Sequence, residues 1–237
     1  MASRSSTNPG VPSGAAGRRP GVTDSAGRER LLDVSLELFS QRGIASTTVA
    51  QIAARSHVTS AMVHYWFKTR EKLLDALVEE RLAPRMREIW EQADFERDSP
   101  LRLVHGLVQR LVVISNRYPW LPSLWLREVI QEGGLLRERV VKRIPPRESA
   151  AFRRVISDGQ STGEINPYIA PDLIFISLLA LVFVPRATGR ILHHLNPEGA
   201  VDEDQYDQHV LALITHGVAA KTAVGRTAFT GPDPSDT

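Results

Sequence analysis

Two short helical segments joined by a tight turn constrain this chain more than any other feature of its sequence. Residues 49–68 read VAQIAARSHVTSAMVHYWFK. Ile52 and Ala53 fall on the inner face of the first segment, and Val63 and Phe67 repeat one turn apart on the inner face of the second. Ala53 is small enough to let the two helices cross closely. The pattern predicts two helices that pack against each other across a turn.

The rest of the chain is also helical in its pattern. No alternating run of Val, Ile and Thr between turn residues suggests a sheet. Gly43 ends the first predicted helix, as a glycine with positive φ does, and Pro185 predicts a kink inside a long apolar helix. In chain order, we expect helices over residues 25–42, 48–55, 60–67, 70–95, 101–117, 121–132, 135–142, 147–162, 171–195 and 203–220. These elements predict an all-α fold.

The outward face of the 60–67 helix carries Ser60, Ala61, His64 and Tyr65. Small and hydrogen-bonding groups at the start of a helix are typical of a recognition helix that contacts base edges in the major groove. Residues 1–72 carry ten Lys or Arg and five Asp or Glu, against 29 and 27 in the whole chain. A basic N-terminal part is typical of a nucleic-acid-binding unit joined to another domain. The alternative is a packed helical hairpin without a DNA-binding role, which these features together disfavour.

Taken together, residues 28–82 resemble the DNA-binding domain of the TetR family of transcriptional repressors (TetR/AcrR-type regulators). The features that carry the resemblance are the Leu38-Phe39 pair followed by Gly43, the Thr47-Thr48 pair, Ile52-Ala53, Val58-Thr59, the aromatic cluster ending in Phe67, and Thr69-Arg70-Glu71 before Leu73-Leu74. The resemblance implies a three-helix head with the helix-turn-helix at residues 49–68.

The resemblance also assigns roles to single residues. Thr48 and Arg70 would contact phosphates, and Lys68 and Lys72 would add non-specific attraction to DNA. The DNA-binding residues that we expect are Thr48, Thr59, Ser60, Ala61, His64, Tyr65, Lys68, Arg70 and Lys72. For Tyr65 the sequence leaves groove contact and packing equally open, and we expect Trp66 to pack between the helix-turn-helix and the fourth helix.

Two positions depart from the family pattern. His57 stands where the turn often has glycine, and His64 stands where an aromatic residue is usual. We expect His57 to adopt the left-handed conformation, at a cost of about 1 kcal/mol in strain. Neither departure changes the predicted fold.

The resemblance implies that the larger C-terminal part is a helical effector-binding and dimerisation domain. Residues 173–184 are apolar on nearly all helix faces, and a four-helix interface between two chains would cover such a helix. Two-fold symmetry would match a palindromic operator. Candidate pocket residues are bulky or polar groups near apolar segments: Trp90, His105, Trp120, Trp125, Arg127, Phe175, Phe183 and Arg186, with Glu128 in the same set.

Several other classes of site are disfavoured. The chain has no cysteine, no glycine-rich phosphate loop, no GxSxG and no HExxH, so we expect neither an enzyme nor a cofactor. His209 and His216 lie two helical turns apart, too far for one metal ion unless further ligands gather. Those further ligands would come from His193, His194, Glu198 and Asp202. The longest apolar run is shorter than the roughly 20 residues that span a bilayer, and we expect a cytoplasmic protein without membrane contact.

The sequence therefore predicts a tail over residues 1–24, a DNA-binding domain over 25–82, an effector-binding and dimerisation domain over 83–222, and a second tail over 223–237. We expect a homodimeric repressor that binds double-stranded operator DNA and is released by a small-molecule effector. In the expected mechanism, the effector moves the fourth helix like a lever. A helical interaction or sensor protein that does not bind DNA specifically is the alternative, and activation fits the sequence as well as repression.

Overall fold

The computed structural model of the chain describes residues 22–189, 191, 194 and 202–220. The predicted tails lie largely outside these ranges, although residues 22–24, which the sequence pattern leaves in the N-terminal tail, begin the first helix. The described residues contain no β-strand and only an isolated antiparallel bridge between Ile165 and Ala219. The prediction of an all-α fold is confirmed.

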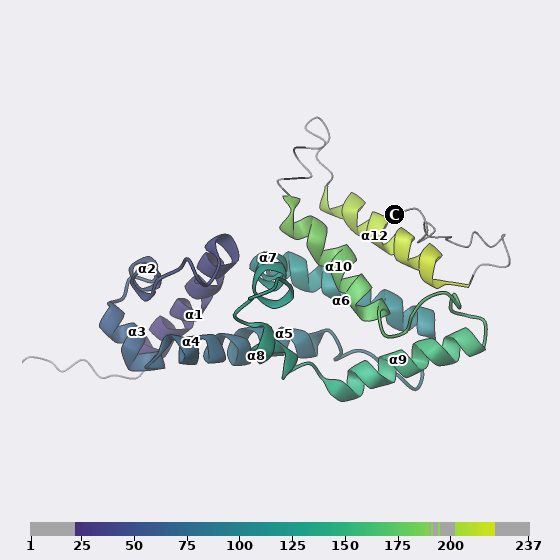
Figure 1. Ribbon diagram of the computed structural model, residues 1–237, viewed down its shortest axis with the longest axis horizontal. Helices are drawn as coiled ribbons and strands as arrows, with labels where there is room; N and C mark the ends of the chain where they lie inside the picture. The colour runs from purple at the N-terminus through teal and green to yellow at the C-terminus, as the bar shows by residue number, and fades with distance from the viewer. Residues whose placement is uncertain (1–21, 190, 192–193, 195–201, 221–237) are drawn as a thin grey trace, which may run out of the picture.

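Figure 1 shows the helices in two groups, with α1–α4 at one end of the molecule and α6, α9, α10 and α12 towards the other. The elements are α1 (Val22–Arg42), α2 (Val49–Arg55), α3 (Ser60–Phe67), α4 (Arg70–Leu77), the π-helical turn η1 (Val78–Leu82), α5 (Ala83–Glu88), α6 (Pro100–Arg117), α7 (Trp120–Trp125), the π-helical turn η2 (Leu126–Ile130), α8 (Arg137–Val141), α9 (Pro146–Ser161), α10 (Ile174–Ala187) and α12 (Glu203–Val218).

Threonine caps set the helix starts in the N-terminal head. Thr48 Oγ1 accepts the Gln51 N–H (3.2 Å) while Gln51 Oε1 accepts the Thr48 N–H (2.8 Å), which closes a capping box on α2. Thr59 and Thr69 cap α3 and α4 in the simpler way, each through one side-chain oxygen. The inner faces of the head bury a continuous set of large side chains, which includes Leu31, Leu32, Leu36, Phe39, Ile52, Val63 and Phe67.

The fourth predicted helix is shorter than expected and is interrupted. It runs from α4 through η1 to the end of α5 at Glu88, not to Phe95. Pro84 has no N–H to donate to the carbonyl of Glu80, and the backbone accommodates this with the π-helical turn just before it. Beyond Glu88 the chain turns, and the Asp94 carboxylate accepts the N–H groups of Glu96 and Arg97, a local alternative to helical bonding.

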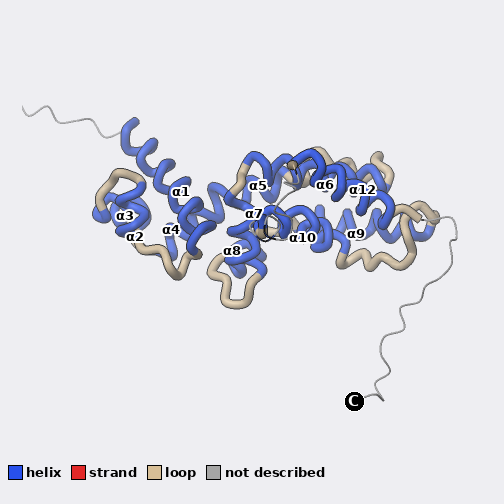
Figure 2. Tube along the Cα trace, turned by 90° about the horizontal axis from the view of Figure 1, so that it is seen from above, coloured by secondary structure: helices blue, strands red, loops and turns tan. Residues whose placement is uncertain are grey.

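The C-terminal domain is built around α6, whose apolar face is buried by α10, α12, α7 and α9 (Figures 1 and 2). The predicted helix over residues 171–195 begins later than expected, at Ile174, and it is interrupted at Thr188, after which residues 189, 191 and 194 are again helical. Pro185 lies in the last turn of α10, so it precedes the end of the helix and does not kink its middle. Part of the remaining predicted range lies outside the described residues.

Candidate nucleic-acid interface and internal cavity

The turn between α2 and α3 fixes how α3 leaves the head. His57 N–H donates to the Ala54 carbonyl (3.2 Å), and Val58 N–H donates to the Ala53 carbonyl (3.0 Å), the two bonds of a Schellman motif. His57 has a φ of 57°, so the predicted left-handed conformation at this position is confirmed. The motif reverses the chain and turns the N-terminal half of α3 outward.

The outward residues of α3 form one exposed surface. Ser60, Ala61, His64 and Tyr65 are all exposed, while Val63 and Phe67 face the core. Tyr65 is 60% exposed, so this side chain does not pack into the head. Lys68 Nζ lies 5.4 Å from the centroid of the Tyr65 ring, which places a cation beside the same surface.

The expected phosphate contacts border this surface. The Thr48 and Thr59 hydroxyls are exposed and accept cap bonds, and a hydroxyl that accepts still has a proton to donate. Lys72 is exposed and lies 3.6 Å from the Asp75 carboxylate. The Arg70 guanidinium is partly buried and donates to the carbonyl of Ile44, in the loop between α1 and α2. Arg70 therefore holds the head together whatever else it contacts.

Trp66 lies against α1. A Cβ placed on Gly27 would come within 2.9 Å of Trp66 Cη2, so the indole occupies the space that this glycine leaves open. Packing of Trp66 against the fourth helix stays a prediction, and the structure adds α1 as a neighbour. Gly27 is the sequence feature that could have predicted this contact. A glycine inside a helix lowers the stability of the helix, so its presence there suggests that another side chain packs closely against it.

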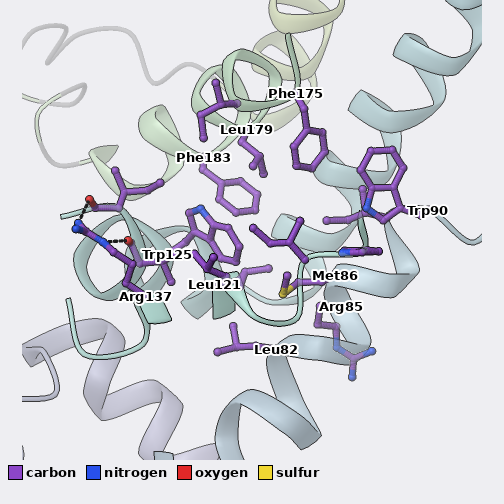
Figure 3. A pocket seen from close by; sticks show the side chains of 17 residues that line it. Leu82, Arg85, Met86, Trp90, Leu121, Trp125, Arg137, Phe175, Leu179 and Phe183 are labelled. Carbon is purple, nitrogen blue, oxygen red and sulfur yellow. Dashed lines mark hydrogen bonds between the residues drawn. The ribbon is translucent and has the colours of Figure 1, made fainter. Parts of the chain in front are cut away.

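The C-terminal domain contains a cavity of about 350 Å³ (Figure 3). Four of the eight predicted pocket residues line it, and all four are aromatic: Trp90, Trp125, Phe175 and Phe183. Sequence reasoning missed most of the aliphatic wall, which includes Leu82, Met86, Leu121 and Leu179. These residues come from η1, α5, α7 and α10, whose relative placement no local pattern reveals.

The other four predicted pocket residues do not line this cavity and connect other elements. His105 Nε2 lies 2.6 Å from Thr215 Oγ1 of α12. Arg186 forms an ion pair with Asp207 of α12 and stacks over Tyr206, with its guanidinium carbon 4.6 Å from the ring centroid. Burial raises the pKa of Tyr206 to about 12. The remaining two face elsewhere, since Trp120 packs on Tyr118 and the Arg127 side chain lies against Gly43 in the head.

Glu128 is the polar residue that links the cavity wall to the head. Its side chain is buried, with the residue only 5% exposed. One carboxylate oxygen accepts the N–H of Ile44 (2.8 Å) and the other accepts the N–H of Leu135 (3.2 Å). Val129 and Ile130, the next residues of η2, line the cavity. Glu128 was a pocket candidate because it is polar, but its carboxylate instead joins the C-terminal domain to the head.

Two other classes of site have no support in the described part of the chain. It holds no group of three or more His, Cys, Asp or Glu side chains that could bind a metal ion. His193 and Glu198, which the sequence placed among possible ligands, lie outside the described residues. None of the described helices is long and apolar enough to cross a membrane.

The head matches a known protein family. Residues 31–77 match the family model described as bacterial regulatory proteins, tetR family. The matched range runs from α1 to the end of α4 and includes the whole of α2 and α3. Over 195 residues the chain is 22% identical to the HTH-type transcriptional repressor KstR2 of Mycolicibacterium smegmatis, covering 81% of this chain and 90% of that protein. It is 26% identical over 158 residues to the HTH-type transcriptional regulator RutR of Escherichia coli strain K12, with coverages of 64% and 70%.

Solved structures share the fold over most of the chain. The ketosteroid transcriptional regulator KstR2 of Mycobacterium tuberculosis matches with a TM-score of 0.62 at 20% identity, over 87% of this chain and 99% of that one. HlyIIR, a hemolysin II transcriptional regulator, matches with a TM-score of 0.60 at 16% identity, over 81% and 98%. The head of the chain, residues 31–77, belongs to the TetR family of bacterial regulatory proteins.

This TetR-family chain is a DNA-binding transcriptional regulator and not an enzyme. TetR-family regulators bind operator DNA and act as dimers with small-molecule effectors. The predicted family and the predicted class of function are thus confirmed.

Proposed function

We propose that this regulator represses transcription by binding a palindromic operator as a homodimer, and that an effector bound in the cavity releases it. In this proposal residues 25–82 form the DNA-binding domain and residues 83–222 the effector-binding and dimerisation domain. The observation that carries the proposal is the exposed surface of α3, where four side chains able to contact base edges or methyl groups lie side by side. A basic rim of Lys68, Arg70 and Lys72 would meet the phosphates.

The dimer is supported by an uncovered apolar stripe on α10. Leu181 and Val184 are exposed on the same face, and Leu173 continues it at the helix start. On α12, Leu213 is 49% exposed. The Arg186–Asp207 pair joins α10 to α12, so the two helices present these faces together. A second copy related by a two-fold axis would bury both faces in a four-helix interface.

Release by an effector is supported by a short chain of contacts from the cavity to the DNA-binding surface. Glu128 precedes the cavity-lining residues Val129 and Ile130, and its carboxylate accepts the N–H of Ile44. The carbonyl of Ile44 accepts a hydrogen bond from Arg70 at the start of α4. A molecule that displaced η2 would therefore move the α1–α2 loop and Arg70 with it.

The fourth helix offers a second route, as the lever mechanism requires. Leu82, Arg85 and Met86 line the cavity, and they lie on the near-continuous helical run that begins with Arg70. A shift of this run would change the spacing between the two recognition helices of a dimer. The operator affinity would fall because both half-sites could no longer be contacted at once.

Electrophoretic mobility shift with the DNA upstream of the protein's own gene tests the proposal. We expect a sequence-specific complex whose affinity falls steeply as the salt concentration rises, because phosphate contacts release counterions. The control is a scrambled fragment of equal length. Equal affinity for both fragments would refute operator binding and favour the alternative of a helical interaction protein. A second arm measures transcription from that fragment, where activation by the chain would contradict repression.

A further inference from the structure

The interior of the cavity is aromatic, and its accessible wall is almost entirely apolar. The rings of Trp90 and Phe175 lie 5.0 Å apart between centroids, and the rings of Trp125 and Phe183 lie 6.2 Å apart and nearly perpendicular. Figure 3 shows these rings around the cavity, with Leu121 and Met86 beside them. Walls of this kind bind flat or alicyclic apolar molecules, since little solvation is lost when such a molecule enters.

The two arginines of the wall make hydrogen bonds to other parts of the protein, although Arg85 Nε is buried and has no hydrogen-bond partner among the described residues. The Arg137 guanidinium donates to the carbonyls of Val129 (3.0 Å) and Ile130 (2.6 Å) at the end of η2. Arg85 Nη1 donates to Glu88 (3.2 Å), and in Figure 3 its guanidinium is turned away from the rings. The accessible wall of the cavity is almost entirely apolar, so a carboxylate inside it would be buried among apolar groups, which is strongly unfavourable.

One donor in the ring cluster is unused. Trp125 Nε1 is buried and has no hydrogen-bond partner among the residues that the structure describes. In Figure 3 the indole nitrogen lies on the edge of the Trp125 ring nearest Phe183. Buried polar groups without partners are uncommon in native proteins, and an indole N–H can only donate. The missing partner is thus a hydrogen-bond acceptor.

The size and the mouth of the cavity limit the rest of the molecule. Its volume of about 350 Å³ is more than twice that of the roughly 150 Å³ cavity known to hold benzene, so two fused rings with a short substituent fit. Ile130, Val141, Ile144 and Ile176 line the cavity and are themselves exposed, which marks the side where it opens. An apolar molecule can enter between η2, α8 and α10 past these apolar side chains.

We propose that the cavity selects an uncharged, mostly apolar molecule of about bicyclic size with one hydrogen-bond acceptor, of the ketone or ether type, which Trp125 Nε1–H binds. This inference rests on the proposed function of the cavity as the effector site and adds the chemical class of the effector and the residue that selects it.

Three naphthalene probes of nearly equal shape test the inference: methyl naphthyl ketone, ethylnaphthalene and naphthoate. Isothermal titration calorimetry on the free protein should show the ketone binding about tenfold more tightly than the hydrocarbon, because only the ketone accepts the Trp125 N–H. Naphthoate should bind most weakly. In Trp125→Phe, which keeps a ring and removes the donor, the ketone should lose its advantage over the hydrocarbon.

Two further variants make the result specific. Trp120→Phe removes an indole of the same helix that does not line the cavity, so it should keep the preference for the ketone. Leu179→Phe fills the cavity and should abolish binding of all three probes. Equal affinities of ketone and hydrocarbon for the unaltered protein, tightest binding of naphthoate, or a preference that survives in Trp125→Phe would each overturn the inference.

Operator binding is measured in separate experiments, so the two proposals fail in different ways. If the chain binds its operator and no probe binds, the inference about the ligand class is overturned and the repressor proposal stands. If the ketone binds through Trp125 but never weakens operator binding, the inference about the cavity holds and effector release is overturned.

Discussion

The DNA-binding head and the C-terminal domain are both helical, but their helices start in different ways. In the head, α2, α3 and α4 each begin with a threonine whose side chain bonds to the backbone. In the C-terminal domain, Ser99 and Asp202 cap α6 and α12, but the four helices α7, α8, α9 and α10 begin without any side-chain cap bond. The two π-helical turns, η1 and η2, also lie at the cavity.

This difference separates a part whose local geometry is fixed from a part that can respond. Each cap contributes about 1 kcal/mol to a short helix and defines its first residue. Uncapped helices and π-helical turns depend on the side chains packed around them, and π-helical turns are frequent at functional sites. Filling the cavity would therefore displace α7, α8 and η2 more easily than the helices that present the proposed DNA-binding surface.

The largest effect is expected at the junction between the two regions. Glu128→Ala should lower the free energy of unfolding by about 3 kcal/mol, because two backbone N–H groups, of Ile44 and Leu135, lose a buried charged acceptor. Urea unfolding measures it. Glu132→Ala, at an exposed position nearby, should change stability by no more than about 0.5 kcal/mol. Equal effects of the two substitutions would show that the junction does not couple the regions.

The next effect concerns function and leaves stability unchanged. Tyr65→Ala should weaken operator binding by about tenfold, because the side chain is exposed on the proposed groove-contacting surface. The urea unfolding curve should not move. Tyr168→Ala is the matched control, since Tyr168 is also highly exposed but lies in the C-terminal domain. If both variants bind the operator as the unaltered protein does, the DNA-binding face has been misplaced.

A smaller effect is expected at the strained turn of the head. His57→Gly should raise the free energy of unfolding by about 0.5 kcal/mol, because relief of the left-handed strain exceeds the entropy that glycine adds to the unfolded chain. Ala54→Gly, three residues earlier in α2, should lower it by about 1 kcal/mol. Thermal unfolding of both variants measures the two changes in stability. If His57→Gly destabilised the protein, the histidine side chain would make a contact whose stabilisation exceeds the strain of its left-handed backbone.

The smallest effect is expected at the Arg28–Glu80 pair, which joins α1 to η1. The hydrogen bond from Arg28 holds the pKa of Glu80 below its ordinary value of 4.5. A carboxyl whose pKa is lowered by folding stabilises the protein above its ordinary pKa, and this contribution is lost as the pH falls through the lowered pKa. Both side chains are about one-third exposed, so solvent screens the pair and Glu80→Gln should cost only about 0.5 kcal/mol at neutral pH. Unfolding measured against pH should show the difference vanish in acid, and a constant difference would assign it to packing.

In the head, local sequence determines much of the structure. The bounds of α3, the caps at Thr48, Thr59 and Thr69, and the left-handed His57 all follow from interactions between residues at most five apart. Such interactions are encoded in short patterns, and the same patterns carry the family resemblance. The exposed set Ser60, Ala61, His64 and Tyr65 follows from helical periodicity once Val63 and Phe67 are assigned to the core.

In the C-terminal domain, only the tertiary structure determines which side chains line the cavity and which bind distant segments. The sequence presents Trp120 and Trp125 as equivalent candidates, yet the fold turns one towards Tyr118 and the other into the cavity. It presents Glu128 as one more polar group in an apolar segment, whereas its partner Ile44 lies 84 residues away. Periodicity shows which face of each helix is buried, but which faces meet depends on packing between distant segments. The cavity, its unused donor at Trp125 and the junction at Glu128 exist only because those segments come together.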